Sequence, residues 1–493
     1  MSRIDRTALA EWAHRHRWAI AVIAAAFLIR LHWNLVVHPI GDYVYSDMNG
    51  YNRRANSVLS SPLSQYAYTV FFPPGTHWLL AGFKLLFGGD NYTAFGICYA
   101  AMGTGVVAYT YGVARRLSNR PAYAIAVTSM VAVYYPLISV GGYILSEIPF
   151  SLCLMGALFH LLRTHETGSD RHAWAVGLHL AAGTLIRPQL LMGAAAFGLY
   201  WLATRRHMPK ITWSSLLRVA VPLVLALSFA SARFYWHTGR VGLISDNGTI
   251  NRVFGRCHNK GIYARPTEDS PSTIRFAPPP LIQLEAHTAV NPDSWIRLAP
   301  VFADHPEPIE GVDGFAVDEF GCTRRTCRIP GGEIEYRGYI ADKELQNKIV
   351  AACIERSGLL RQAYFGFVHI VQLWGYNSMW PDQADPRPRP DEPLQSWRAL
   401  AEFWRRLAAY LFAIPCLLGL GWIFRPAQHL GRALVGLQMV ALFAVAFLYI
   451  GGVRFRIPYD PLMFMLSGLV FERVFEWVYA RVRTRGSAEA PTA

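Results

Sequence analysis

The chain has 493 residues, of which 53% are hydrophobic and only 16% charged, and its formal net charge is +14. The apolar residues gather in runs of about twenty, the length that a helix needs to cross roughly 30 Å of hydrocarbon. The basic residues lie in short clusters at the ends of these runs, as topology signals and lipid-headgroup contacts do. The composition therefore indicates a polytopic membrane protein and argues against nucleic acid as a partner.

The apolar runs predict an all-α membrane protein with about ten transmembrane helices and additional interfacial helices. We expect the spans at 18–37, 92–114, 121–138, 143–162, 173–187, 189–204, 212–232, 403–423, 431–450 and 456–478. No small-residue cleavage site follows the first run, so we expect it to be a retained anchor. Residues 76–87 are apolar but too few to cross a bilayer, and they suit an interfacial or re-entrant helix better.

The charges of the loops predict the orientation of the spans. With the N-terminus inside, every cytoplasmic loop carries at least two basic residues, as the positive-inside rule expects. These loops are Arg115–Arg120, Arg163–Arg171, Arg205–Lys210 and Arg425–Arg432, followed by the tail from Arg481. We therefore expect a protein of the cytoplasmic (inner) membrane with both termini in the cytoplasm.

Three regions follow from this topology. Residues 1–232 form an N-terminal membrane region with a first outer loop at 38–91, and 403–493 supply C-terminal membrane helices and a cytoplasmic tail. Residues 233–402 are rich in proline, glycine and scattered charge, and they predict a mixed, loop-rich extracytoplasmic domain. Within it, 341–375 has helical spacing of apolar residues.

The cysteines give little evidence for a metal. Those in the apolar runs are expected to be inert packing residues, namely Cys98, Cys153 and Cys416. Cys322 and Cys327 could form a short disulfide if their region lies outside the cytoplasm, and this stays open. Together with the Cys257–His258 pair they offer ligand types without zinc spacing, so a divalent metal is unsupported and no cofactor is assigned.

Asp47 lies a few residues beyond the first expected span. If the stretch is helical, Asp47, Tyr51 and Ala55 share one face at steps of four. Such a carboxylate at the membrane surface could be a general base that takes a proton from an acceptor hydroxyl. Alternatively it is a helix N-cap, or a loop carboxylate paired with one of the two arginines that follow. Asp42 is the nearby competitor, and it lacks partners at matching steps.

Glu147 lies at the expected outer start of a span, in the stretch Leu145–Pro149. A carboxylate there is costly unless it faces water or a cation. Glu147 could position a substrate or pair with an arginine of a site. It could equally be an N-terminal helix carboxylate favoured by the macrodipole, with Pro149 in the first turn.

Three arginines stand at the expected outer face, where topology does not need positive charge, and they are Arg187, Arg454 and Arg456. A guanidinium group binds phosphate oxygens in a bidentate way. The alternative is that these side chains extend to lipid headgroups. Three arginines against two acids on one face favour a site for an anionic ligand.

The order of these motifs resembles the GT-C superfamily of integral-membrane glycosyltransferases, in particular the branch with protein O-mannosyltransferases and the aminoarabinose transferase of lipid A. The matching pieces are Asp47–Ala55, Pro73–Gly75, Leu145–Glu147, Arg187–Pro188 and Arg454–Pro458. The resemblance covers about 18–232 and 403–478, and leaves 233–402 without a counterpart.

The resemblance implies a glycosyltransferase that moves a sugar from a polyprenyl-phosphate donor to an extracytoplasmic acceptor, with inversion at the anomeric carbon. In that family the first-loop aspartate is the candidate base, and here that residue is Asp47. Our hypothesis for the mechanism adds phosphate binding by Arg187 with Arg454 or Arg456, and Tyr51 and Asp42 as supporting residues. Many members carry an Asp-Glu pair in the first loop, whereas Met48 follows Asp47 here, which leaves Glu147 as the candidate second acid.

The expected partners are thus the lipid-linked donor, membrane lipids and an acceptor that the sequence does not identify. The alternative function is a transporter or flippase of lipid-linked saccharides. Such a protein would need polar groups at mid-depth in its spans. The best candidate is Arg30, in the outer half of the first span.

Overall fold

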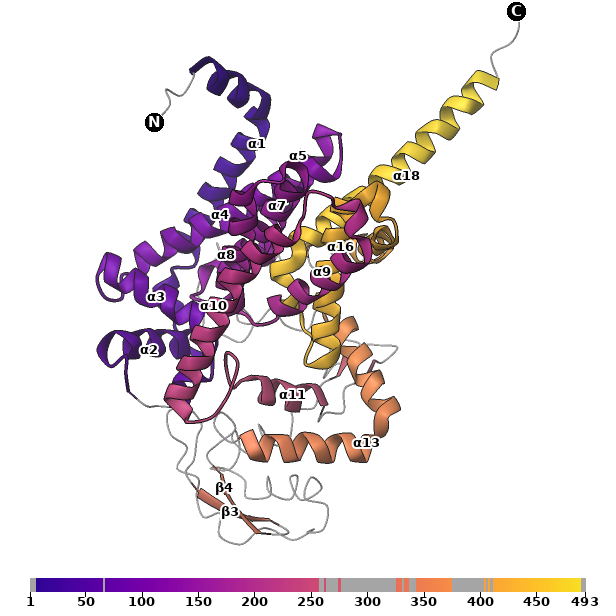
Figure 1. Ribbon diagram of the computed structural model, residues 1–493. Coiled ribbons are helices and arrows are strands. Elements are labelled where there is room, and N and C mark those ends of the chain that lie inside the picture. Colours follow the sequence, from indigo (N-terminus) through magenta and orange to yellow (C-terminus); the bar gives the residue numbers. More distant parts are fainter. Residues whose placement is uncertain are drawn as a thin grey trace, which may run out of the picture.

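A bundle of long helices makes up most of the computed structural model (Figure 1). The structure describes residues 6–64, 67–256, 261–262, 274–275, 325–329, 332–336, 343–374, 403–404, 407 and 411–488. Both termini lie at one end of the bundle, and α11 and α13 cross the opposite end. The expected all-α membrane architecture is confirmed, and the division into three regions stays a prediction.

The first half of the chain supplies most of the bundle. It contains α1 (Arg6–His32), a π-helical turn (Trp33–Val37), a 3-10 turn (Ile40–Tyr43), α2 (Ser46–Ser60), a 3-10 turn (Ala67–Val70), α3 (Pro74–Phe87), α4 (Tyr92–Leu117), α5 (Pro121–Val133), α6 (Tyr135–Ser139), a 3-10 turn (Val140–Gly142), α7 (Glu147–Thr167), α8 (Asp170–Ile186), α9 (Leu190–Thr204), a 3-10 turn (Arg205–His207), α10 (Trp213–Thr238) and α11 (Gly248–Arg256).

The second half adds two short antiparallel strand pairs and closes the bundle. It contains β1 (Gly261–Ile262) with β2 (Ile274–Arg275), β3 (Arg325–Ile329) with β4 (Gly332–Tyr336), α13 (Lys343–Gln372), α15 (Ala413–Gly419), a 3-10 helix (Leu420–Phe424), α16 (Pro426–Leu448), α17 (Val453–Arg456), a 3-10 turn (Ile457–Tyr459) and α18 (Asp460–Ala488). The helix expected at 341–375 is α13, which is interrupted at Gly358, where φ is 73°.

Four helices within the described ranges are long and apolar enough to span a bilayer. They are Glu11–Val37, Tyr92–Leu117, Trp213–Thr238 and His429–Leu448, and the bent pair Pro121–Val133 with Tyr135–Gly142 makes up to five. Two of the expected spans form helices too short to be counted among these, since α8 has 17 residues and α9 has 15. The count of ten therefore stays a prediction.

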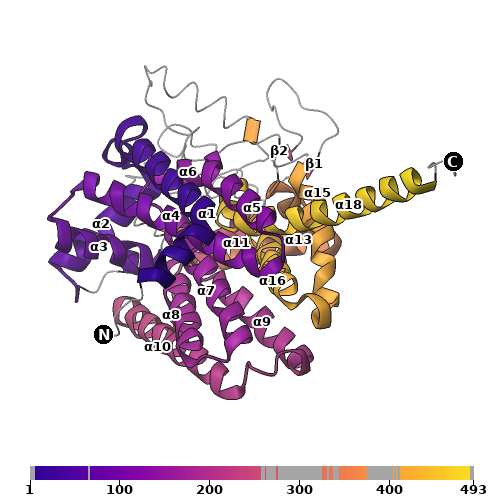
Figure 2. The same cartoon turned by 90° about the horizontal axis from the view of Figure 1, so that it is seen from above.

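The helix α7 lies in the centre of the bundle, packed between α4 and α8, as the view in Figure 2 also shows. Glycines allow the close approach of α4. A Cβ at Gly105 would lie 2.8 Å from Leu152, and one at Gly112 would lie 2.7 Å from Phe159. Small residues repeated along one face let membrane helices pack backbone to backbone. These contacts hold the middle of α7 close against α4.

A bend of 53° separates α5 from α6 at Tyr134. Pro136, in the first turn of α6, has no backbone N–H with which to continue the helix. The buried guanidinium of Arg30 donates to two carbonyls at the end of α5, Val131 at 3.1 Å and Ala132 at 2.9 Å. Arg30 therefore satisfies backbone groups that the bend leaves without intrahelical partners.

The helix α3 corresponds to the interfacial helix expected at 76–87, and its first turn packs against the end of α8. At Gly75 the two backbones are in close contact. A Cβ there would lie 2.7 Å from the backbone nitrogen of Ile186, the residue before Arg187. A backbone atom cannot move aside as a flexible side chain can.

The variant Gly75→Ala is therefore expected to force α3 and α8 apart and to lower the free energy of unfolding by about 1–3 kcal/mol. Thermal unfolding of the purified protein in detergent measures the change. Gly82→Ala is the matched control, because it lies on the same helix and a Cβ there meets nothing within 4 Å. Equal unfolding temperatures for the two variants would refute the close contact.

Candidate functional site

Four charged side chains from distant parts of the sequence meet at one end of the bundle. Asp47 lies in the first turn of α2, Glu147 begins α7, Arg187 follows α8 and Arg454 lies in α17. The two carboxylates and two guanidinium groups form a continuous series of ion pairs. The structure thus brings together four of the residues that the sequence marks as candidates.

The helix expected after the first span is present as α2, with Asp47 near its N-terminus. Ser46, the residue before Asp47, has a φ of 46°, a left-handed conformation that few non-glycine residues adopt. Strain of this kind persists only where the surrounding structure holds it, and it is concentrated at functional sites.

Asp47, Tyr51 and Ala55 share one face of α2. Asp47 is partly exposed, whereas Tyr51 and Ala55 are buried in the protein. Tyr51 is buried, and its ring stacks on Phe72 with centroids 4.7 Å apart. Burial and the neighbouring Asp47 carboxylate raise the pKa of Tyr51 above its ordinary value. Tyr51 is therefore a neutral packing partner that fixes the position of α2.

Glu147 is the buried centre of the series, with no exposed side-chain surface. Its Oε1 accepts hydrogen bonds from Nη2 of Arg187 and from Nε of Arg454. Ser146 donates to Oε2 at 3.3 Å and accepts from Nε of Arg187 at 2.8 Å. A buried carboxylate requires such compensation, because desolvation of an unpaired charge is costly.

Arg454 joins the buried and the exposed parts of the site. Its Nη1 donates to Oδ2 of Asp47 at 3.0 Å, while its Nε contacts Glu147. Burial alone lowers the pKa of Arg454, but Glu147 and Asp47 outweigh it and hold the pKa above its ordinary value. Arg454 is therefore charged, and it is shared between two carboxylates.

Solvent access increases from Glu147 toward Asp47. The exposed fractions of the side chains are 0% for Glu147, 11% for Arg187, 19% for Arg454 and 31% for Asp47. Arg187 uses Nε and Nη2 for Ser146 and Glu147, and within the described part of the chain its Nη1 donates to no protein group. An anion that approaches from the Asp47 side would meet two guanidinium groups beside a carboxylate.

Arg456 does not join this series. Its Nε donates to Asp460 at 2.7 Å within a fully buried pair, and its Nη2 lies 3.2 Å from the hydroxyl of Tyr134. Its guanidinium also lies 5.0 Å from the ring of Trp374. Arg456 thus connects α18 with the start of α6 and the end of α13.

Asp42 is also outside the series, and it is the exposed residue of a 3-10 turn. Sequence reasoning did not assign Ser146 or Phe455 to the site, although both stand beside candidates. Ser146 bonds both Arg187 and Glu147, and the Arg187 guanidinium lies 5.9 Å from the Phe455 ring. Ser146 precedes Glu147 and Phe455 follows Arg454 in the chain, and this adjacency is the feature of the sequence that could have indicated their place in the site.

No cluster of three or more potential metal ligands occurs among the residues that the structure describes. The side chains of Cys257, Cys322 and Cys327 lie outside those residues, so the disulfide and the metal ligands stay untested. The cysteines expected to be inert packing residues are free thiols in helices. Cys153 and Cys416 are buried, and Cys98 is partly buried.

One protein-family model matches the chain. It is described as dolichyl-phosphate-mannose-protein mannosyltransferase, and it matches residues 72–236, which include Glu147 and Arg187. The match covers less than half of the chain and confirms the expected resemblance to protein O-mannosyltransferases. Comparison with curated protein sequences gives no match.

Several solved structures are similar in outline. An Archaeoglobus fulgidus oligosaccharyltransferase tethered to an acceptor peptide has 11% sequence identity and a TM-score of 0.43, with 96% of this chain and 51% of that chain covered. ArnT from Cupriavidus metallidurans bound to undecaprenyl phosphate has 13% identity and a TM-score of 0.37, with 92% and 77% covered. The chain thus spans about half the length of the archaeal enzyme.

Proposed function

We propose that the protein is an inverting membrane glycosyltransferase that moves a sugar from a polyprenyl-phosphate donor to an extracytoplasmic acceptor. The observation that carries the proposal is the convergence of Arg187 and Arg454 on buried Glu147, next to the partly exposed Asp47. Two fixed guanidinium groups suit a phosphate, and an adjacent carboxylate suits an acceptor hydroxyl.

The family match supports the class of donor. The matched family is described by a sugar carried on a polyprenyl-type lipid phosphate, and the match spans the α3–α10 region that positions Glu147 and Arg187. A donor with a long lipid tail fits a site at the end of a membrane-helix bundle, because its tail can remain in the bilayer while its phosphate reaches the arginines.

In the proposed reaction the acceptor oxygen attacks the anomeric carbon from the side opposite the phosphate. The bond between that carbon and the phosphate oxygen breaks, and the phosphate leaves with the bonding electrons. Arg187 and Arg454 stabilise the charge that builds on the phosphate. Asp47 accepts the proton of the acceptor hydroxyl, while Glu147 holds both arginines in place as a positioning residue.

The loop charges support a placement of this site on the outer face of the cytoplasmic membrane, with both termini inside. Residues 233–402 would then lie outside the cytoplasm. They are the part of the chain where we propose that acceptor choice resides, since the matched family segment ends at 236.

The second candidate, a flippase of lipid-linked saccharides, would carry the donor without breaking its sugar–phosphate bond. Its best mid-depth cation was Arg30, which donates instead to the carbonyls of α5. The deciding experiment gives purified protein a polyprenyl-phosphoryl sugar and an acceptor mixture. We expect release of free polyprenyl phosphate, and translocation without release would overturn the proposal.

Arg187→Gln is expected to lower kcat/KM for this release by roughly ten- to a hundredfold, because it removes charged hydrogen bonds worth about 1.5–3 kcal/mol from the phosphate. Initial rates across donor concentrations measure the loss. Arg218→Gln is the matched control, since Arg218 pairs with Asp170 at the other end of α8. An Arg187→Gln enzyme as active as this control would exclude Arg187 from phosphate binding.

A further inference from the structure

A polar pocket of about 460 Å³ lies where the end of α4, the start of α16 and the middle of α18 meet. The candidate active site adjoins the opposite ends of α4 and α16. Both helices are long, at 26 and 23 residues, so the pocket and the site are separated by roughly 35–40 Å of helix. The basic side chains that line the pocket are Arg116, Arg120, His429, Arg432 and Arg473.

The two acids of the pocket are already paired. Arg120 contacts Glu472 at 3.3 Å and Glu476 at 2.9 Å, and Arg473 contacts Glu476 at 3.3 Å. Ser118 also donates to Glu472, at 2.6 Å. Among the described residues, the ion pairs of Glu472 and Glu476 are with Arg120 and Arg473 and not with Arg432.

Arg432 retains an unused donor. Its Nε donates to the carbonyl of Leu117 at 3.0 Å, and its guanidinium lies 5.3 Å from the ring of Trp422. Within the described ranges its Nη1 is buried without a hydrogen-bond partner. A buried guanidinium N–H of this kind costs free energy unless a ligand or water accepts from it.

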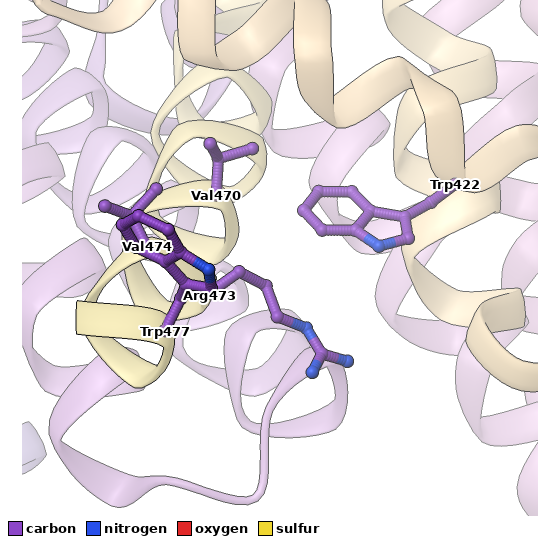
Figure 3. A pocket seen from close by; sticks show the side chains of 5 residues that line it. All are labelled: Trp422, Val470, Arg473, Val474 and Trp477. Carbon is purple, nitrogen blue, oxygen red and sulfur yellow. The ribbon is translucent and has the colours of Figure 1, made fainter. Parts of the chain in front are cut away.

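An apolar groove of about 380 Å³ adjoins the polar pocket, and Arg473 lines both. Its other walls are Trp422 and, along one face of α18, Val470, Val474 and Trp477 (Figure 3). Trp477 is 56% exposed and Val474 is 51% exposed. Tryptophans beside arginines are typical of the boundary between hydrocarbon and headgroups.

We propose that the pocket and groove together bind one anionic glycerophospholipid. Its phosphate accepts hydrogen bonds from Arg432 and Arg473, and an acyl chain lies along the groove between Trp422 and Trp477. The excess of basic over acidic side chains selects an anionic headgroup, and basic pockets between membrane helices bind such headgroups in general. The site is distinct from that of the donor, at the other end of the bundle.

Native mass spectrometry of the full-length protein, with phosphatidylglycerol or phosphatidylcholine added in equal amounts, tests the proposal. We expect retention of phosphatidylglycerol in preference to phosphatidylcholine. The double variant R432Q/R473Q is expected to lose this retention by roughly tenfold, because each removed guanidinium takes a charged hydrogen bond with it. The control R205Q/R206Q removes equal charge from exposed arginines at the same end and should retain the lipid.

Equal retention of the two lipids, or equal loss in the control variant, would overturn the proposal in favour of unspecific attraction. Trp477→Ala is expected to weaken phosphatidylglycerol retention several-fold while the protein stays folded, as circular dichroism shows. Excess inorganic phosphate should not displace the lipid, because it lacks the chain that fills the groove. Displacement by phosphate alone would identify the pocket as a site for a free anion.

Discussion

Asp47→Asn is expected to lower the rate of sugar transfer by about 10²–10⁴-fold, the usual contribution of a general base. Asparagine keeps the shape of the side chain and its contact distance to Arg454, but it cannot take the proton of the acceptor. Asp47 is partly exposed and α2 is held by buried Tyr51 and Ala55, so the variant should fold. Release of polyprenyl phosphate per unit time measures the effect.

The matched control is Asp170→Asn, the same chemical change at the opposite end of the bundle, where Asp170 pairs with Arg218 and is 61% exposed. It should transfer sugar at close to the wild-type rate. A folded Asp47→Asn protein that also does so would exclude Asp47 as the base. If Asp47→Asn keeps its activity only when the acceptor group is a phosphate, the base is needed only for hydroxyl acceptors, because a phosphate is already ionised.

Glu147→Gln is expected to lower the free energy of unfolding by about 3–5 kcal/mol, the range for removing one partner of a buried ion pair. The variant leaves Arg187 and Arg454 side by side with Asp47 as the only carboxylate of the series. The repulsion between the two guanidinium groups is then poorly compensated. Chemical unfolding in detergent, followed by helical circular dichroism, measures the loss.

Glu166→Gln provides the comparison for this variant. Glu166 lies on the same helix and pairs with two arginines, Arg116 and Arg163, but its side chain is 37% exposed. Exposed pairs contribute at most about 1 kcal/mol, so this variant should unfold close to wild type. A Glu147→Gln protein as stable as Glu166→Gln would show that the buried carboxylate does not hold the arginines.

Periodicity and charge in the sequence predict much of this fold, because both depend on local rules. The helical face of α2, the short helix α3 and the long apolar helices all follow from spacing and length. Shared placement on one face also predicted that Asp47, Glu147, Arg187 and Arg454 belong together. Their pairing required the three-dimensional structure, because up to 407 positions separate the partners.

Arg456 lies in a different environment from Arg454, and its expected role in phosphate binding stays a prediction. Arg454 and Arg456 are two positions apart in the same short motif, and both were expected to hold phosphate. In α17 two positions amount to a rotation of about 200°, so the side chains point in different directions. Arg456 pairs with Asp460, four positions further along the chain. The spacing of the two residues permits this ion pair, but the phosphate hypothesis did not consider it.

The shared guanidinium of Arg454 has a kinetic consequence. Arg454 donates to both Asp47 and Glu147, so the carboxylate of the proposed base is paired with a cation. An arriving phosphate competes with Asp47 for the same Nη1, and the carboxylate becomes available only as the donor settles. The enzyme would then follow a compulsory order, donor before acceptor, and an acceptor that arrives first would find no competent base.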